Sequence, residues 1–480
     1  MAIELTKADR FPHRVLAPAF LLACLLLGGS SSGGAVANGL LQLIGLGVIL
    51  VVLAGRGGLV VTSAAWSVLA ITGAAVAYLL VTLVPLPPSL WTMFPHREGV
   101  AHGFALLGVP APMLGISLDR DGTIRALLSL VPPVAMFLSI LAAPAAARRH
   151  AVMLLGIAAA VSVLLGVAQV ATGFRSNLYL YAITSRGGAV GFFANRNHLA
   201  TLCLMTLPWM AALAASARQG SSKATRVGQH VVALGMLTFL TLGAGVVQSL
   251  AGWLLLLPTL LGSWLIYQHR RNARLINRVA PILGLVLISA ILLALFAPLS
   301  PTDLNRTLGE TRPDQRHVMM ATTAQAAWNY FPVGSGAGTF QRLYPQYEDP
   351  RQSTLAYVNH AHNDYLELVL EMGVVGLVLL AALLGWWAVQ ARRLWSAAAP
   401  NQPLGRAATV SLLILFAHSF VDYPVRTSAI AAVAALACGL MAAREDGQPY
   451  GASRRRGRTR GGLGGDMDRS RTIQLGVSRR

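Results

Sequence analysis

Twelve long apolar runs, separated by shorter polar segments, constrain what this chain can fold into more than any other feature of its sequence. A run of about 20 apolar residues, wound as an α-helix, crosses the roughly 30 Å hydrocarbon core of a bilayer. A large soluble helical protein would instead need a polar face on most helices, and runs such as 279–298 have none. We therefore predict an all-α, polytopic integral membrane protein. Its transmembrane helices, about twelve in number, centre on residues 15–29, 36–54, 59–84, 126–146, 151–172, 198–217, 228–247, 249–267, 279–298, 364–390, 405–421 and 427–443.

The positions of Lys and Arg predict how these helices are oriented. If the N-terminus is cytoplasmic, 26 of the 38 basic residues fall on the cytoplasmic side, which then carries the whole net charge of +20. This asymmetry is the pattern that the positive-inside rule describes. We expect a multi-pass protein of the bacterial inner (cytoplasmic) membrane whose longer polar loops face the periplasm.

The basic C-terminal segment, residues 444–480, raises the question of nucleic-acid binding. Because it is rich in Gly and Arg, we interpret it as a disordered cytoplasmic tail that lies against anionic membrane lipids, and we predict no nucleic-acid partner. The three cysteines fall inside predicted spans and indicate neither a disulfide framework nor a zinc site.

Three segments on the periplasmic side, 85–125, 173–197 and 299–363, are too long to be simple connectors. The last contains enough aromatic residues among its charges to fold against the membrane domain. We therefore predict a large periplasmic loop domain between the ninth and tenth spans.

This domain begins with a stretch of helix-like spacing that places Arg312 and Arg316 one turn apart. Two guanidinium groups on one face suit a phosphate or diphosphate, because each can donate paired hydrogen bonds to anionic oxygens. The alternative is that they form ion pairs with Asp303, Glu310 or Asp314.

Three alternating glycines follow, at positions 334, 336 and 338. They resemble a phosphate-cradling loop, but no strand precedes them and nucleotides are scarce outside the cytoplasm, which excludes a Rossmann or Walker site. We predict a tight turn that brings the backbone close to a substrate or to a neighbouring helix.

The domain ends in a run of polar residues, Asn359-His360-Ala361-His362-Asn363-Asp364, that leads directly into an apolar helix. Asn363 or Asp364 can cap this helix, which puts His362 at its outer end, where free N–H groups favour anions. A histidine there is largely neutral at neutral pH and can act as a general base. The alternative is that His362 only satisfies the cap or binds lipid headgroups.

Two further features of this run bear on a possible site. His360 and His362 are also potential metal ligands, but no further ligand set is apparent, so we predict no metal and no cofactor. Glu367 and Glu371 lie one turn apart just inside the membrane end of the helix, where carboxylates usually mark function or a buried partner.

A second polar cluster lies at the end of the loop 173–197. Arg186, Arg196 and His198 fall at the outer membrane edge, at the depth predicted for His362. Polar groups from distant segments thus gather on one side of the membrane, as expected for a site that acts on a lipid-linked substrate.

These stretches resemble the superfamily of O-antigen ligases and O-antigen polymerases, which includes bacterial exopolysaccharide polymerases. The likeness covers roughly residues 180 to 380. Its ligase signature is a His-Asn pair followed by nine residues and Gly-x-x-Gly, which His362-Asn363 and Gly373-Val374-Val375-Gly376 match. Four stretches carry the likeness: Arg186 to His198, Arg316 to Trp328, Pro332 to Phe340 and His360 to Leu366. The chain departs from its relatives at residues 243–252, where Ser-Arg-Gly is usual, which leaves Arg196 or Arg306 to replace that arginine.

The resemblance implies a GT-C-like membrane glycosyltransferase that needs neither a nucleotide sugar nor ATP. A glycan on undecaprenyl diphosphate would be transferred to an acceptor hydroxyl, on the lipid A core for a ligase or on a growing polysaccharide for a polymerase. His362 would be the catalytic base, and Arg186, Arg312 and Arg316 would bind the substrate diphosphate. The further site candidates are Arg196, His198, His360, Asn363, Asp364 and Glu367.

This interpretation divides the chain into four parts: 1–172 with spans 1–5, a ligase/polymerase-like core at 173–390, the last two spans at 391–443, and the tail 444–480. The signature favours an O-antigen ligase over a polymerase. A secondary transporter is an alternative of another class, but we see no repeat between the halves, and the charged groups cluster on the outer side. An inactive scaffold of a polysaccharide export complex is a third, suggested by the missing arginine.

Overall fold

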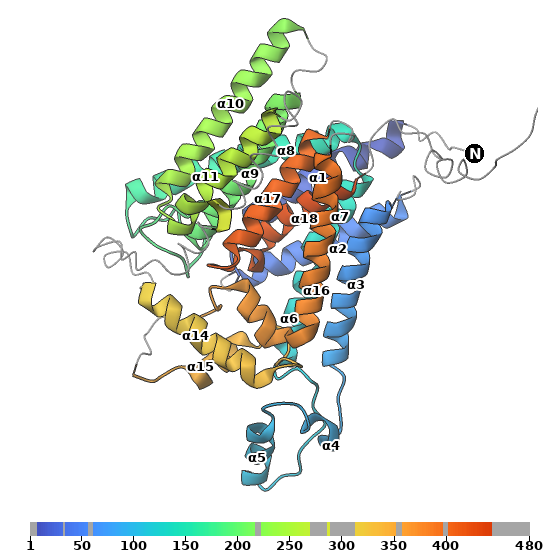
Figure 1. Ribbon diagram of the computed structural model, residues 1–480, viewed down its shortest axis with the longest axis vertical. Helices are drawn as coiled ribbons and strands as arrows, with labels where there is room; N and C mark the ends of the chain where they lie inside the picture. The colour runs from blue at the N-terminus through green and yellow to red at the C-terminus, as the bar shows by residue number, and fades with distance from the viewer. Residues whose placement is uncertain are drawn as a thin grey trace, which may run out of the picture. The chain divides into compact units, whose positions relative to one another are not determined.

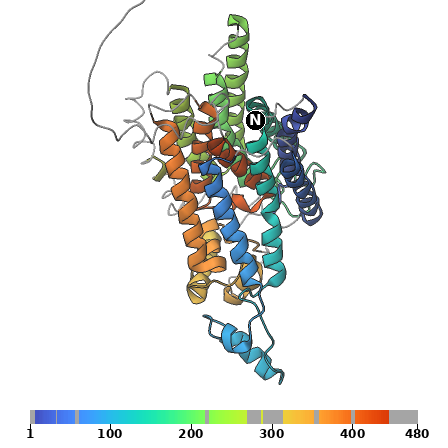
Figure 2. The ribbon, with the colours of Figure 1, turned by 90° about the vertical axis from the view of Figure 1, so that its right-hand side faces the viewer.

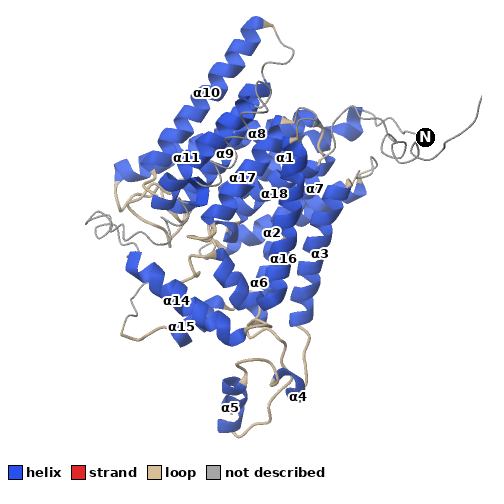
Figure 3. Ribbon diagram, viewed as in Figure 1, coloured by secondary structure: helices blue, strands red, loops and turns tan. Residues whose placement is uncertain are grey.

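The computed structural model describes residues 7–31, 34–55, 61–216, 222–268, 286–288, 313–351, 358–396 and 402–443 (Figure 1). Within these ranges the chain is helical, and the single extended feature is an isolated bridge between Leu86 and Leu114 (Figure 3). The elements are α1 Lys7–Leu27, α2 Ala35–Ala54, α3 Ser63–Thr82, α4 Pro88–Trp91, α5 Glu98–Leu106, α6 Arg120–Ser129, α7 Val131–Ala142, α8 Ala145–Thr172, α9 Arg196–Ser216, α10 Lys223–Val246, α11 Leu250–Gln268, α14 Pro313–Tyr330, α15 Phe340–Tyr347, α16 Asp364–Trp395, α17 Pro403–His418, the 3₁₀ turn η1 Pro424–Arg426 and α18 Ser428–Ala442.

The prediction of an all-α, polytopic membrane protein is confirmed. In the described part of the chain, 8 helices are long and apolar enough to cross a membrane, and three shorter apolar helices accompany them. Their bounds follow the apolar runs of the sequence; the predicted span 364–390, for example, corresponds to α16. The ninth predicted span lies almost wholly outside the described residues, so the total of twelve spans stays a prediction.

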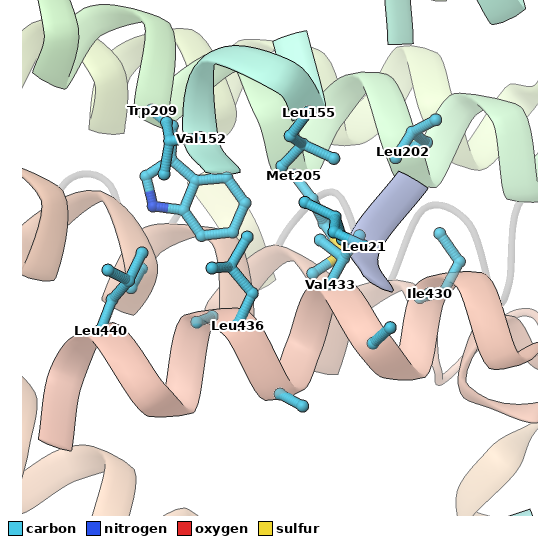
Figure 4. Packing of buried hydrophobic residues seen from close by; sticks show 14 of the residues in the cluster. Leu21, Val152, Leu155, Leu202, Met205, Trp209, Ile430, Val433, Leu436 and Leu440 are labelled. Atoms are coloured by element: carbon cyan, nitrogen blue, oxygen red, sulfur yellow. The ribbon is translucent and has the colours of Figure 1, made fainter. Parts of the chain in front are cut away.

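Helix α9 forms the centre of the bundle. It packs against α8, α10, α11 and α17, and nearly all of its side chains are buried. Figure 4 shows part of this core, where Trp209 of α9 lies near Val152 of α8 and Leu436 of α18. Small residues allow close helix contacts elsewhere, since a Cβ at Gly243 would overlap the side chain of Val163.

The outer helices have the opposite pattern. On α2, Leu43 and Leu50 are 68% and 67% exposed although α2 is strongly apolar. Such side chains would be costly in water but suit a lipid environment, where helix faces need not be polar. The exposed apolar side chains therefore fit a bundle that stands in a bilayer.

Helix α16, α3 and the α6–α7 pair run side by side (Figure 2). At the end where α16 begins, it packs against α14 and α15, which come from the predicted periplasmic loop domain (Figure 1). The predicted helix at 312–330 is thereby confirmed as α14, although Arg312 lies outside the described residues.

The glycines at 334, 336 and 338 form the tight turn that the sequence predicts, and its neighbour is helix α16. All three have positive φ, and a Cβ at Gly334 would lie 2.6 Å from the carbonyl oxygen of Glu371. Inside α16, Gly373 breaks the helical geometry with φ of 53°, and a Cβ there would overlap the carbonyl oxygen of Pro332. Only glycine tolerates both conditions, so these residues fasten the loop to the kink of α16.

Candidate functional site

The beginning of α16 organises the candidate site. Asn363 is the N-cap, and its side-chain oxygen accepts hydrogen bonds from the N–H groups of Tyr365 and Leu366, both at 3.0 Å. The preceding residue, His362, has φ of +51°, in the left-handed region that non-glycine residues seldom occupy. The predicted cap is thus confirmed, and His362 is held in a strained conformation of the kind that gathers at functional sites.

His362 faces a carboxylate from the other side of the site. Its Nδ1 lies 3.2 Å from Oδ1 of Asp422, in the short segment between α17 and α18. A carboxylate at Nδ1 holds the ring proton on that nitrogen, so Nε2 carries the lone pair. The two side chains are 13% and 1% exposed, so water competes little for this contact.

Burial is the main influence on the pKa of His362 and lowers it, while the contact with Asp422 acts in the opposite direction and the charge of Arg316 lowers it further. The imidazole is therefore neutral at neutral pH. Burial alone would raise the pKa of Asp422, but the contact with His362 and the nearby positive groups outweigh it and bring that pKa down, so the carboxylate is ionised. A neutral imidazole oriented by a charged carboxylate is the arrangement of a general base.

His360 forms a second pair of the same kind. Its Nδ1 donates a hydrogen bond of 2.8 Å to Oε1 of Glu367, one turn into α16. The other carboxylate oxygen accepts the N–H of Ala361 at 2.9 Å. Glu367 therefore binds both the side chain and the backbone of the segment that leads to His362.

The ring of Tyr423 joins these groups. Its centroid lies 5.1, 4.5 and 4.9 Å from those of His198, His360 and His362. Its hydroxyl group is hydrogen-bonded to Asn195 and Asn359. One aromatic side chain thus contacts imidazoles that are up to 164 residues apart in the sequence, which brings the loop before α9 and the beginning of α16 together.

Arg426 is the cation of this region, and three carboxylates of α16 surround it. Its guanidinium nitrogens lie 3.5 Å from Asp364, 3.5 Å from Glu367 and 3.1 Å from Glu371. The predicted buried partner of Glu367 and Glu371 is therefore a cation between the last two helices. This cluster ties α16 to the segment that carries Asp422.

The N–H groups of the glycine turn are already in use. Those of Ser335 and Gly336 donate to the carbonyls of Leu370 and Glu371, each at 2.9 Å, and Gly338 donates to the Glu371 carboxylate at 2.8 Å. The turn cannot also cradle a phosphate with these donors, in agreement with the exclusion of a nucleotide loop.

The predicted anion-binding arginines differ in position. Arg316 on α14 is half-buried, and its charge acts on both His362 and Asp422. Arg186 instead contacts the carbonyl of Phe174 and the ring of Tyr179, 5.4 Å away. Arg196 is buried at the first turn of α9. Arg312 lies outside the described residues.

His198, His360, Asn363, Asp364 and Glu367, which the sequence indicates as site candidates, are all brought to the beginning of α16. The sequence interpretation missed Asp422, Tyr423 and Arg426. The sequence feature that could have indicated them is the short charged segment between the last two apolar runs. Charged groups that close to a membrane usually have a partner. Among the described residues, no group of three or more His, Cys, Asp or Glu side chains is arranged to hold a metal ion.

The comparison with protein families matches residues 231–381 to the model described as O-antigen ligase. This range begins in α10 and ends in α16, and it contains His360 and His362 but neither His198 nor Asp422. No curated protein matches the chain.

Proposed function

Because residues 231–381 match the family model described as O-antigen ligase, we propose that this multi-pass protein transfers a glycan from undecaprenyl diphosphate to an acceptor hydroxyl on the periplasmic side of the inner membrane. This match alone supports a glycosyltransferase-like enzyme of ligase or polymerase type. The donor, the acceptor and the side of the membrane are the finer parts of the proposal.

The observation that carries the proposal is the His362–Asp422 pair within reach of the charge of Arg316. Nε2 of His362 takes the proton of the acceptor hydroxyl, whose oxygen forms the new bond to the anomeric carbon. The bond from that carbon to the diphosphate oxygen breaks, and undecaprenyl diphosphate leaves with the electron pair. Arg316, with Arg186 and Arg312, stabilises the negative charge of the leaving group. A single displacement of this kind inverts the anomeric centre.

The packing also supports a replacement for the family arginine that is missing near Gln248. A Cβ built on Gly252, at the beginning of α11, would lie 3.0 Å from Cβ of Ala200 on α9. Arg196 precedes Ala200 by one helical turn and so lies on the same face of α9. We assign to Arg196 the role of that arginine at the outer end of α11.

The acceptor in this proposal is a sugar of the lipid A core, as in an O-antigen ligase. The signature does not decide this point, since its two glycines have a packing role: Gly373 meets Pro332, and Gly376 meets Leu368. Comparing the polysaccharide of a deletion strain with that of its parent tests the acceptor. Long chains left on the lipid carrier indicate a ligase, and single repeat units on the lipid A core indicate a polymerase.

The direct test uses the purified full-length protein in lipid nanodiscs with an undecaprenyl diphosphate-linked glycan and the matching acceptor. His362→Ala and His362→Gln should each lower transfer by on the order of a hundredfold or more, because neither supplies the base. The control is His150→Gln, which changes an exposed histidine near the beginning of α8. Near-normal transfer by His362→Gln, or solute accumulation by wild-type vesicles without any glycan transfer, would contradict the proposal.

Orientation has its own test. A topology reporter fused after Ala321, in α14, should report a periplasmic position. A reporter fused after Arg393, near the end of α16, should report a cytoplasmic position. The reverse result would place the site on the cytoplasmic side and would contradict transfer on the periplasmic side.

A further inference from the structure

His360 has a hydrogen-bonding capacity that the protein leaves unused. Its Nδ1–H donates to Glu367 at 2.8 Å, and because a carboxylate only accepts, the neutral form of this imidazole has its lone pair on Nε2. This Nε2 is buried and has no hydrogen-bond partner among the described residues. Buried polar atoms are nearly always paired, so an unpaired one at a candidate site calls for a partner that binds there.

Unpaired ring nitrogens also occur on a second histidine near His360. His198 is 2% exposed, and both of its ring nitrogens are buried without a hydrogen-bond partner in the described structure. Both imidazoles pack on the ring of Tyr423, which also contacts the proposed base, His362. Unsatisfied polar atoms thus gather beside the reacting group.

We propose that Nε2 of His360 accepts a hydrogen bond from a sugar hydroxyl of the bound substrate, which makes His360 a specificity-determining residue next to His362. This inference rests on the proposed function and names the part of the substrate that the second histidine recognises. A ring nitrogen that carries a lone pair needs a hydrogen-bond donor as its partner. The diphosphate oxygens are acceptors and the isoprenoid chain has neither capacity, whereas a sugar presents several O–H donors.

Two substitutions separate this role from a structural one. His360→Asn keeps a donor near the position of Nδ1, and so can retain the bond to Glu367, but it has nothing in place of Nε2. His360→Gln reaches the position of Nε2 with an amide oxygen and gives up the bond to Glu367. If Nε2 binds a sugar hydroxyl, Asn should lower kcat/KM about tenfold more than Gln, in line with a buried group left unpaired. If His360 only supports Glu367, the order should reverse.

The assay is transfer by the full-length protein in nanodiscs, with KM measured separately for the lipid-linked donor and for the acceptor, and with folding checked by thermal unfolding. The matched controls are His150→Asn and His150→Gln, which should behave alike. A higher KM for the acceptor would show that the hydroxyl is the acceptor's, and a higher KM for the donor that it belongs to the transferred glycan. Equal losses in the two His360 variants, or a larger loss with Gln, would overturn the proposal.

A second measurement decides the matter if an His360 variant does not accumulate. Donors and acceptors that each lack one hydroxyl are given to the wild-type protein, and one of them should react about tenfold more slowly than its parent. If no single deoxygenation has this effect, His360 does not recognise a hydroxyl. Wild-type protein that transfers no glycan at all would instead contradict the proposed function, and the His360 proposal with it.

Discussion

Replacement of Arg426 by Met should destabilise the protein far more than the loss of an ordinary arginine. The guanidinium group lies 3.1 to 3.5 Å from three carboxylates, and their side chains are 12%, 1% and 3% exposed. At this separation each attraction is worth about 4 kcal/mol in an effective dielectric of about 20. Much of that sum offsets the cost of burying these groups, so truncation of one buried partner typically costs about 3–5 kcal/mol.

The size of the effect follows from what the substitution leaves behind. Arg426 is 25% exposed, so water can solvate only part of the site. Without the cation, Asp364, Glu367 and Glu371 are three carboxylates in adjacent turns of one helix, and they must either repel one another or bind protons. We therefore expect Arg426→Met to lower the free energy of unfolding by about 3–5 kcal/mol.

The control is Arg351→Met, which removes an exposed ion pair with Asp349, 3.4 Å apart, and should change stability by less than about 1 kcal/mol. Unfolding of the purified variants can be followed by tryptophan fluorescence in mixed detergent micelles. Adding Glu371→Gln to Arg426→Met should recover part of the loss, because one uncompensated charge is removed. An Arg426 variant as stable as the Arg351 variant would show that the carboxylates do not depend on this cation in the folded protein.

Two further predictions concern the base and the kink of α16. Burial lowers the pKa of His362, so kcat/KM should fall only at pH values below the reference of about 6.5. Asp422→Asn removes a contribution that raises this pKa and should shift the acidic limb of the pH profile to lower pH. Arg316→Ala removes a contribution that lowers this pKa and should shift that limb to higher pH. Shifts of the same sign in both variants would exclude His362 as the titrating group. Gly373→Ala should lower the free energy of unfolding by about 1–3 kcal/mol, because a φ of 53° is strained for alanine. Gly385→Ala, in the same helix with open space around it, should not destabilise the protein. Equal stabilities of the two variants would refute the packing role of Gly373.

Much of the helical architecture was predictable because a bilayer leaves a chain few choices. Apolar runs of membrane-spanning length must form helices that satisfy their own backbone, so the run at 364–390 predicted α16 directly. Local capping rules also identified Asn363 as the residue that begins this helix. The resemblance between 180 and 380 then located His362 and agreed with the family match to residues 231–381.

The partners of these residues were not predictable, because each comes from a distant segment. Asp422 lies 60 positions after His362, and nothing in the spacing of the two shows that they meet. The same holds for Tyr423 and for Arg426, whose short connector reads as a turn between two spans. His360 was indicated only as a neighbour of the signature, and its bond to Glu367 is what sets its tautomer.

Sequence by itself therefore predicted that this protein lies in a membrane and where its apolar helices begin and end, since these depend on composition and on local geometry. Tertiary structure alone decided which carboxylate faces which imidazole, why glycine is required at 373, and which nitrogen of His360 is left unpaired. The physical reason is range: helix formation and capping act within a few residues, whereas the pairing of buried charges depends on how α16, α17 and α18 pack against one another.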